Sequence, residues 1–489
     1  MELIRLALPA LLLLFFVWRS LHERVFLLGI PFLMYMAQAV FFYKLKIFYV
    51  PGRLEPADHV MLWLLVVWVV YFDLLLPGRR RSLRDRRPLG PRLSTPEEVV
   101  LLGLAAYAAL EVVLTVLRFG SVGATLGEAK GWIYLFVGYF LLRGILVHAG
   151  RTQTVHLLSA IVGVNTLAAV LYIAHQGLHL SIYEATEYQT IVFMGRELTR
   201  TFYFMPQFLI LATAFSIAQK RWTLWWAGVF IVTLGALWIS YTRSLLVIAV
   251  VEVVVVLGVR LLKSREAGLA FRRALAIGGI VVVFVVVAFA ALPVQSQYLL
   301  SRIGMATASG DVTADENLQN RERKMQNVYE WIESESRTLG QGFASPAQHW
   351  PAGDIEWMAA DLVWVPVLYR LGVAGIALFV ALFVAFAWRS LSLAVSGTGD
   401  AEFLGLVFLG ALAGVFLEGF VSWTVLNPDR YPMGLWLFAF VAAEACRRRR
   451  EAAEALEAAE EPAAPGGSRA ARPQVAAAVL VPRPGGGHD

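Results

Sequence analysis

Apolar runs recur along almost the whole chain, and they constrain its fold more than any other feature of the sequence. A helix needs about 20 consecutive apolar residues to cross the hydrocarbon core of a bilayer, and several of these runs are close to that length. The composition agrees, because 58% of the 489 residues are hydrophobic and only 16% are charged, whereas a soluble domain has about 25% charged residues. The sequence therefore predicts an all-α integral membrane protein and excludes an ordinary soluble enzyme.

Hydropathy divides the chain into about twelve or thirteen transmembrane helices of the length that a bilayer requires. The expected spans are 3–18, 25–43, 59–76, 97–118, 131–147, 154–176, 203–219, 222–240, 242–262, 273–293, 361–383, 403–425 and 432–446. We interpret the first run as a retained span and not as a signal peptide, because arginines follow it and no small-residue cleavage site precedes them.

The same pattern predicts four regions. Transmembrane helices with short loops occupy 1–293, an external loop occupies 294–360, further transmembrane helices occupy 361–446, and a tail follows at 447–489. The loop is acidic, and its apolar residues between 318 and 332 recur at helical spacing. We therefore expect an amphipathic helix in the loop and disorder in the tail, which is rich in Ala and Glu and then in Pro and Gly.

Basic clusters predict how the chain lies in the membrane. Segments 77–96, 260–273 and 447–450 are rich in arginine, and short loops rich in Lys and Arg stay on the cytoplasmic side. Counting spans between these clusters gives the same side each time. The count places four parts of the chain outside: the N-terminus, 177–202, 240–243 and 294–360.

Several arginines fall on the expected external side, where basic residues are disfavoured, and four of them are candidates for binding a substrate. Arg196 and Arg200 precede a span. Arg243 ends the turn 240–243, and Arg321 lies on the apolar stripe of the amphipathic helix. A guanidinium on an apolar face needs a partner, because burying an unpaired charge is costly. A diphosphate is a suitable partner, since its oxygens match the two-pronged donor set of arginine.

Each arginine also has a plainer interpretation, and the sequence leaves both open. Arg196 fits a solvated surface charge or a head-group contact. Arg200 and Arg243 fit snorkelling to the membrane interface, and Arg321 fits an ion pair with a neighbouring glutamate. Whether the four side chains converge in space does not follow from the sequence.

Two glycine motifs, Leu339-Gly340-Gln341-Gly342-Phe343 and Leu371-Gly372-Val373-Ala374-Gly375-Ile376, complete the pattern. In their order and sidedness these motifs and the arginines resemble the O-antigen ligase and O-antigen polymerase superfamily of membrane polysaccharide glycosyltransferases. The resemblance covers about residues 190–380. The matching segments are Arg200-Thr201-Phe202, Ser240-Tyr241-Thr242-Arg243, Arg321 with Trp331 and Gly340-Gln341-Gly342, and Leu371-Gly372 with Gly375.

The resemblance implies a metal-independent, inverting glycosyltransferase that needs no cofactor and uses an undecaprenyl-diphosphate-linked oligosaccharide in surface polysaccharide assembly. Arg200, Arg243 and Arg321, with Arg196 beside them, would bind the diphosphate, and Arg243 would also act in catalysis by stabilising charge on the leaving group. The acceptor distinguishes a polymerase, which extends another lipid-linked unit, from a ligase, which transfers the glycan to lipid A core or protein. Asp361, at the position where the family has its catalytic histidine, favours a polymerase.

At the position of the family's catalytic histidine, eleven residues before Gly372, this chain has Asp361. Asp361 is therefore the candidate base, because a carboxylate in the right position can also accept the proton of a hydroxyl group. His349, twelve residues before Asp361, is the alternative base. Asp361 also fits a second role, as the N-cap of the span that follows it.

Two further charges, Glu252 and Arg370, fall inside spans at similar depths, and we expect them to pair. No metal site is expected, since the eight histidines are scattered and Cys446 is the single cysteine. The acidic pair in Asp354-Ile355-Glu356, which resembles that of metal-dependent sugar transferases, is the alternative.

The expected location is the bacterial inner membrane, in a multi-pass arrangement whose active site faces the periplasm. The expected partners are the lipid-linked oligosaccharide and the lipid bilayer, and no nucleic acid. A chain-length regulator would be compatible with a polymerase, although no residue points to one. The rival class is a transporter or flippase for a lipid-linked glycan, which inverted repeats with broken helices would favour; no clear repeat is visible in the sequence.

Overall fold

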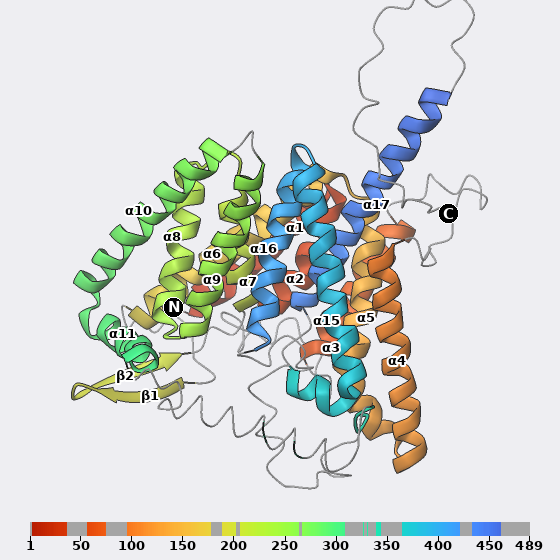
Figure 1. Ribbon diagram of the computed structural model, residues 1–489, viewed down its shortest axis with the longest axis horizontal. Coiled ribbons are helices and arrows are strands. Elements are labelled where there is room, and N and C mark those ends of the chain that lie inside the picture. The colour runs from red at the N-terminus through yellow and green to blue at the C-terminus, as the bar shows by residue number, and fades with distance from the viewer. Residues whose placement is uncertain are drawn as a thin grey trace, which may run out of the picture. The chain divides into compact units, whose positions relative to one another are not determined.

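The computed structural model describes residues 2–36, 56–74, 95–177, 188–201, 206–263, 267–308, 326, 330, 339–343, 364–420 and 433–460. The described residues are helical apart from one antiparallel hairpin and connecting turns (Figure 1). The chain forms two compact units, Met1–Ala445 and Cys446–Asp489. The candidate site discussed below lies in the first unit, and α17 runs from the first unit into the second.

Within the described ranges, seven helices are long and apolar enough to cross a membrane, which agrees with the expected multi-pass helical membrane protein. These helices are α4 (Pro96–Phe119), α5 (Val122–His148), α6 (Arg151–Gly177), α9 (Arg243–Leu262), α10 (Ala267–Ala291), α15 (Trp364–Ser396) and α16 (Asp400–Glu418). The total of twelve or thirteen spans stays a prediction.

The other helices are shorter or only partly apolar. They are α1 (Glu2–Ser20), η1 (Arg24–Leu28), α2 (Gly29–Met36), α3 (Pro56–Val69), η4 (Val70–Leu74), α7 (Pro206–Ala218), α8 (Leu224–Ile239), α11 (Pro293–Ala308) and α17 (Met433–Glu460). Two helices continue well past the expected ends of their spans. Helix α15 runs to Ser396 where we expected 383, and α17 runs to Glu460 where we expected 446. Hydropathy detects the apolar part of a helix, whereas alanine, glutamate and arginine continue the same helix into polar surroundings.

A β-hairpin interrupts the otherwise helical chain, and the prediction of an all-α protein missed it. Strands β1 (Tyr188–Phe193) and β2 (Arg196–Thr201) pair antiparallel, with Tyr188 opposite Thr201 and Phe193 opposite Arg196. The two turn residues between the strands, Met194 and Gly195, have φ angles of 51° and 72°. A two-residue turn between antiparallel strands commonly requires positive φ at both of its residues, and this turn has that conformation.

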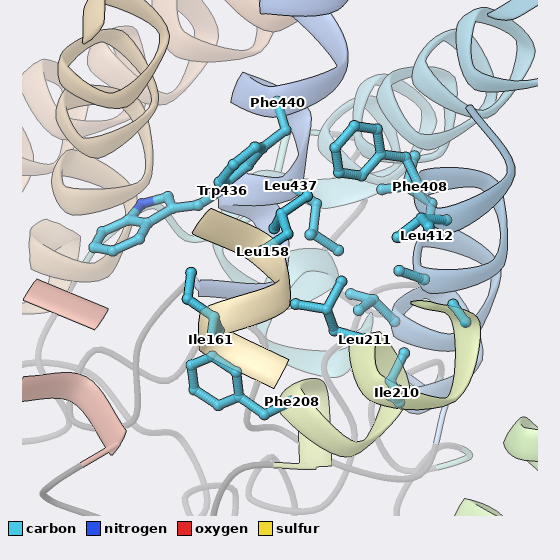
Figure 2. Packing of buried hydrophobic residues seen from close by; sticks show 14 of the residues in the cluster. Leu158, Ile161, Phe208, Ile210, Leu211, Phe408, Leu412, Trp436, Leu437 and Phe440 are labelled. Atoms are coloured by element: carbon cyan, nitrogen blue, oxygen red, sulfur yellow. The ribbon is translucent and has the colours of Figure 1, made fainter. Parts of the chain in front are cut away.

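Helix α16 lies at the centre of the bundle because its glycines allow other helices to approach closely. A Cβ atom on Gly410 would lie 2.9 Å from the side chain of Val256 on α9, and one on Gly414 would lie 2.7 Å from Ile210 on α7. The neighbouring core contains apolar side chains from four helices (Figure 2). Those labelled there are Leu158, Ile161, Phe208, Ile210, Leu211, Phe408, Leu412, Trp436, Leu437 and Phe440.

One end of the bundle is held by ion pairs between helices, and we call it the ion-paired end. The pairs are Lys263–Glu402 at 3.1 Å, Arg389–Glu97 at 2.6 Å and Arg151–Glu444 at 2.6 Å. They join the end of α9 to the start of α16, the end of α15 to the start of α4, and the start of α6 to α17. Because it includes the basic segment after α9, this end is the one that the charge pattern predicts to be cytoplasmic.

The opposite end of the bundle contains the start of α9, the end of α16 and the start of α15. Helices α9 and α16 run antiparallel, since their contacts pass from Lys263–Glu402 to Val256–Gly410. The ring of Trp364, at the start of α15, lies 5.2 Å from that of Phe416 near the end of α16. The turn before Arg243 and the beginning of α15 therefore share one end, which we call the open end.

Candidate functional site

Helix α15 breaks at the open end. Gly372 has φ 62° and ψ −166°, which lies outside the helical region and is readily adopted only by glycine. The rings of Trp364 and Phe379 lie 5.5 Å apart, although these positions would be about 22 Å apart along a straight helix. The first two turns of α15 therefore fold back against the rest of the helix.

The break leaves backbone carbonyl groups without their helical hydrogen bonds, and the segment 339–343 donates hydrogen bonds to them. In an unbroken helix the carbonyls of Tyr369 and Arg370 would accept hydrogen bonds from the next turn. Here they accept from the backbone N–H groups of Gln341, at 2.8 Å, and Gly342, at 2.9 Å. The glycine motif 339–343 and the glycine motif 371–376, which the sequence suggested as parts of one pattern, thus meet in space.

The two glycines of the first motif are required by this close approach. Gly340 and Gly342 have φ angles of 79° and 75°, in the left-handed region that favours glycine. A Cβ atom on Gly340 would lie 2.5 Å from the backbone nitrogen of Gly372, and one on Gly342 would overlap the hydroxyl of Thr115. That hydroxyl instead accepts a hydrogen bond of 2.9 Å from the N–H of Phe343.

Helix α4 closes the other side of this junction. The hydroxyl of Tyr107 lies within hydrogen-bond distance of two backbone carbonyls, those of Leu371 at 3.0 Å and Leu339 at 3.2 Å. One turn further along α4, Glu111 is 4% exposed, and its Oε1 has no hydrogen-bond partner within the described part of the chain. The segment 339–343 is therefore clamped between α4 and the break in α15.

A charged pair lies against the break. Arg370 Nη2 is 2.6 Å from Glu128 Oε2 on α5, and its Nη1 donates to the backbone carbonyl of Glu128 at 3.1 Å. The guanidinium also lies 5.8 Å from the ring centre of Phe343. The expected pair between Glu252 and Arg370 is thus wrong. We counted depth along an unbroken helix, whereas the break turns Arg370 toward the start of α5.

Further polar contacts gather at the same end. Arg118, at the end of α4, donates to Gln341 Oε1 at 3.4 Å, and the Nε2 of this buried glutamine has no partner within the described ranges. Lys130 pairs with Asp58 at 2.8 Å. We call Glu111, Arg118, Glu128, Gln341 and Arg370 the break cluster.

The hairpin and the turn before Arg243 form a second assembly at the open end. Leu198 of β2 and the rings of Tyr241 and Tyr298 form a buried apolar cluster. The Tyr241 and Tyr298 rings are 5.5 Å apart, and Phe193 of β1 lies 5.3 Å from Tyr298. The backbone that carries Arg196 and Arg200 is thereby held against the turn that precedes Arg243, beside α11 (Figure 1). We call this the arginine-turn assembly.

The candidate residues differ in what the structure describes of them. Arg243 is the first residue of α9 and is partly buried. Arg196 and Arg200 belong to β2 by their backbone, but their side chains lie outside the described residues, as do the candidates Arg321, His349 and Asp361. The segments that carry three of the candidate arginines are thus brought together.

Sequence reasoning missed the break cluster as a unit. Glu128 and Lys130 interrupt an apolar run, which is why we expected the span to start at 131, yet α5 begins at Val122 and includes both residues. A charged residue inside a helical run was the signal that could have identified them, because such residues face the bundle interior or a partner. Arg118 ends the span expected at 97–118, on the side that the span count places outside, so the rule that basic residues are disfavoured there could also have identified it.

Metal binding has no support in the described ranges, where no three His, Cys, Asp or Glu side chains come close enough to hold an ion. Asp354 and Glu356, the alternative acidic pair, lie outside those ranges. Comparison with known proteins gives no independent assignment, because no protein-family model and no curated protein matches this chain.

Proposed function

We propose that this chain is a membrane glycosyltransferase that uses an undecaprenyl-diphosphate-linked glycan in surface polysaccharide assembly. The observation that carries the proposal is the meeting of the two glycine motifs at the break in α15, at the end of the bundle that also holds the arginine-turn assembly. The motifs run from Arg200 to Gly375 in the sequence, and the segments that the structure describes lie at the same end of the bundle. That location is the end that the arginine clusters predict to be external.

In the proposed reaction, Arg200, Arg243 and Arg321 bind the diphosphate and stabilise the charge that develops on it as it leaves. The hydroxyl oxygen of the acceptor attacks the anomeric carbon, and the bond between that carbon and the diphosphate oxygen breaks. Asp361 accepts the hydroxyl proton, with His349 as the alternative base. One displacement inverts the anomeric centre, and the products are a glycosidic bond and undecaprenyl diphosphate.

Single substitutions measured by glycosyl transfer in purified protein test these roles. Arg243→Ala and Arg321→Ala should each reduce transfer by about a hundredfold or more, as expected for removal of a group that stabilises transition-state charge. Arg323→Ala, two residues away in the segment that we expect to form an amphipathic helix, is the matched control and should retain activity. Asp361→Asn and His349→Asn compared side by side identify the base, and loss confined to Arg323→Ala would contradict the assignment.

Polymerase and ligase differ only in the acceptor. We favour the polymerase because the position of the family's histidine is occupied by Asp361. Offering the purified protein lipid-linked repeat units alone, or repeat units together with lipid A core, separates the two activities. Growth of the lipid-linked glycan without a second acceptor identifies a polymerase, and a requirement for lipid A core identifies a ligase.

A transporter or flippase for a lipid-linked glycan is the second candidate, and one observation favours it. Helix α15 is discontinuous at Gly372, and broken helices near a binding site are typical of secondary transporters. The carbonyls freed by this break are, however, bonded to Gln341 and Gly342 and are not open to a substrate. Movement of the lipid-linked glycan across a bilayer without any new glycosidic bond would favour the transporter.

A further inference from the structure

Glu252 is a buried ionisable side chain that neither assembly at the open end uses. It lies midway along α9, between Arg243 and Leu262, and its exposed fraction is 0%. Neither of its carboxyl oxygens has a hydrogen-bond partner among the residues that the structure describes. A carboxylate in that situation would be a bare buried charge, which is far more costly than the neutral acid.

The carboxyl group is enclosed at the junction of α7, α9 and α16. A Cβ atom on Gly414 of α16 would lie 2.7 Å from Glu252 Oε1 and 2.7 Å from the side chain of Ile210 on α7. Glycine at 414 therefore provides the space that the carboxyl group occupies. The group is sealed by helix packing, and it can reach water only if α9 and α16 separate.

The charged groups on the helices around α9 do not neutralise it. Helices α7 and α8 contain no charged residue. On α16 the nearest in sequence to Gly414 is Glu418, one turn further along, whose Oε1 accepts from Gln207 Nε2 at 3.2 Å. Glu418 is also an acid, so any charge on it would be negative and would not favour ionisation of Glu252.

The basic residues of the remaining neighbours are committed elsewhere or are not described. Arg370 and Arg389 of α15 pair with Glu128 and Glu97. Arg273 of α10 donates to the backbone carbonyl of Lys220, at the ion-paired end, where Arg272 is also found. The side chain of Arg302 on α11 lies outside the described residues.

We infer that Glu252 is a proton-binding site of this protein. In the packed arrangement of α7, α9 and α16 the side chain is a neutral carboxylic acid. Loss of its proton requires water or a cation to reach it, and therefore requires α9 to move away from Gly414. Proton release and the opening of this junction are thus linked.

A proton fits the site better than a metal cation does. Hard cations in proteins take about six or more oxygen ligands, whereas the residues placed beside the Glu252 carboxyl at this junction, Gly414 and Ile210, have no side-chain oxygen. The inference does not rest on the proposed glycosyl transfer, because it follows from burial and packing alone. A glycosyltransferase and a transporter would both contain it.

Infrared spectroscopy of the full-length protein in liposomes tests the inference directly, since neutral carboxyl groups have a C=O stretching band that carboxylates lack. At neutral pH the wild-type protein should show such a band, Glu252→Gln should lose it, and Glu418→Gln, the matched control, should retain the band that Glu252→Gln removes. Identical carboxyl bands in the wild-type protein and Glu252→Gln would overturn the inference.

A second variant covers the case in which Glu252→Gln does not fold. Glu252→Asp keeps the carboxyl group and should move the band instead of removing it, and an unmoved band would contradict the assignment. Spectra in sodium-containing and sodium-free buffer exclude the metal alternative. A band that appears only without sodium would identify a cation site and overturn the proton assignment. None of these readouts depends on transfer activity, so failure here and failure of the proposed function are separate results.

Discussion

The hydroxyl of Thr115 lies so close to the backbone at position 342 that only glycine, which has no Cβ atom, fits at that position. The same hydroxyl accepts the N–H of Phe343, so a shift of the segment to make room would also break that bond. A Cβ atom on Gly340 would likewise clash with the backbone of Gly372. A motif that the sequence suggested as part of a catalytic pattern therefore has a packing reason of its own.

Gly342→Ala tests this explanation. The new methyl group would combine a strained φ with a clash, and we expect it to lower the free energy of unfolding by about 2–4 kcal/mol. Gly195→Ala is the matched control, because Gly195 has a φ of 72° but nothing within 4 Å of the added Cβ. Thermal unfolding of the detergent-solubilised protein should show a much larger loss for Gly342→Ala. Equal losses would mean that backbone strain, and not the contact with Thr115, explains the glycine.

Between elements, the pair of Arg370 and Glu128 joins the folded-back part of α15 to the start of α5. The sequence could not provide this pairing, because the choice of partner depends on a break that hydropathy does not detect. Both Glu252 and Glu128 were available, and only the turn at Gly372 determines which one lies beside the guanidinium.

A double-mutant cycle measures this contact. Arg370→Ala and Glu128→Ala should each destabilise the protein, and the double variant should be less harmful than the sum by about 1–2 kcal/mol, as expected for a partly buried ion pair. Arg370→Ala combined with Glu252→Gln is the control and should be additive. Coupling of Arg370 to Glu252 instead would restore the pairing that we expected from the sequence.

The hairpin and the helix ends show what else sequence patterns left out. The apolar runs predicted the seven long helices, because the period of apolar residues and the length of a bilayer are both visible in a sequence. Strands β1 and β2 are short and stabilised by distant residues, Tyr241 and Tyr298, which no local pattern connects to them. Of the candidate site, the location of the arginine-turn assembly and of the glycine motifs follows from the fold, while the roles of Arg321 and Asp361 stay predictions.

For the chain as a whole, the two ends of the bundle differ in what they contain. Ion pairs between helices, with the basic segment after α9 beside them, occur at one end, and the break cluster and the arginine-turn assembly occur at the other. The positive-inside rule assigns the first end to the cytoplasm. The opposite end would then face the exterior, where nucleotide sugars are absent, and the donor that we propose is already linked to a lipid.

Cysteine labelling tests this orientation. In a Cys446→Ser background, Met194→Cys would place a thiol in the hairpin turn, where Met194 is 72% exposed, and Thr398→Cys would place one in the exposed turn between α15 and α16. A membrane-impermeant maleimide should label Met194→Cys in intact cells and Thr398→Cys only after permeabilisation. Labelling of both from the same side would contradict the antiparallel order of the helices, and the reverse pattern would invert the orientation.

The most direct measurement of the central claim is glycosyl transfer by the purified protein in liposomes that contain lipid-linked repeat units. The account predicts new glycosidic bonds and release of undecaprenyl diphosphate without added nucleotide sugar, and near-complete loss of both in Arg243→Ala. Transbilayer movement of the lipid-linked glycan with no new glycosidic bond would contradict it, and so would full activity of Arg243→Ala.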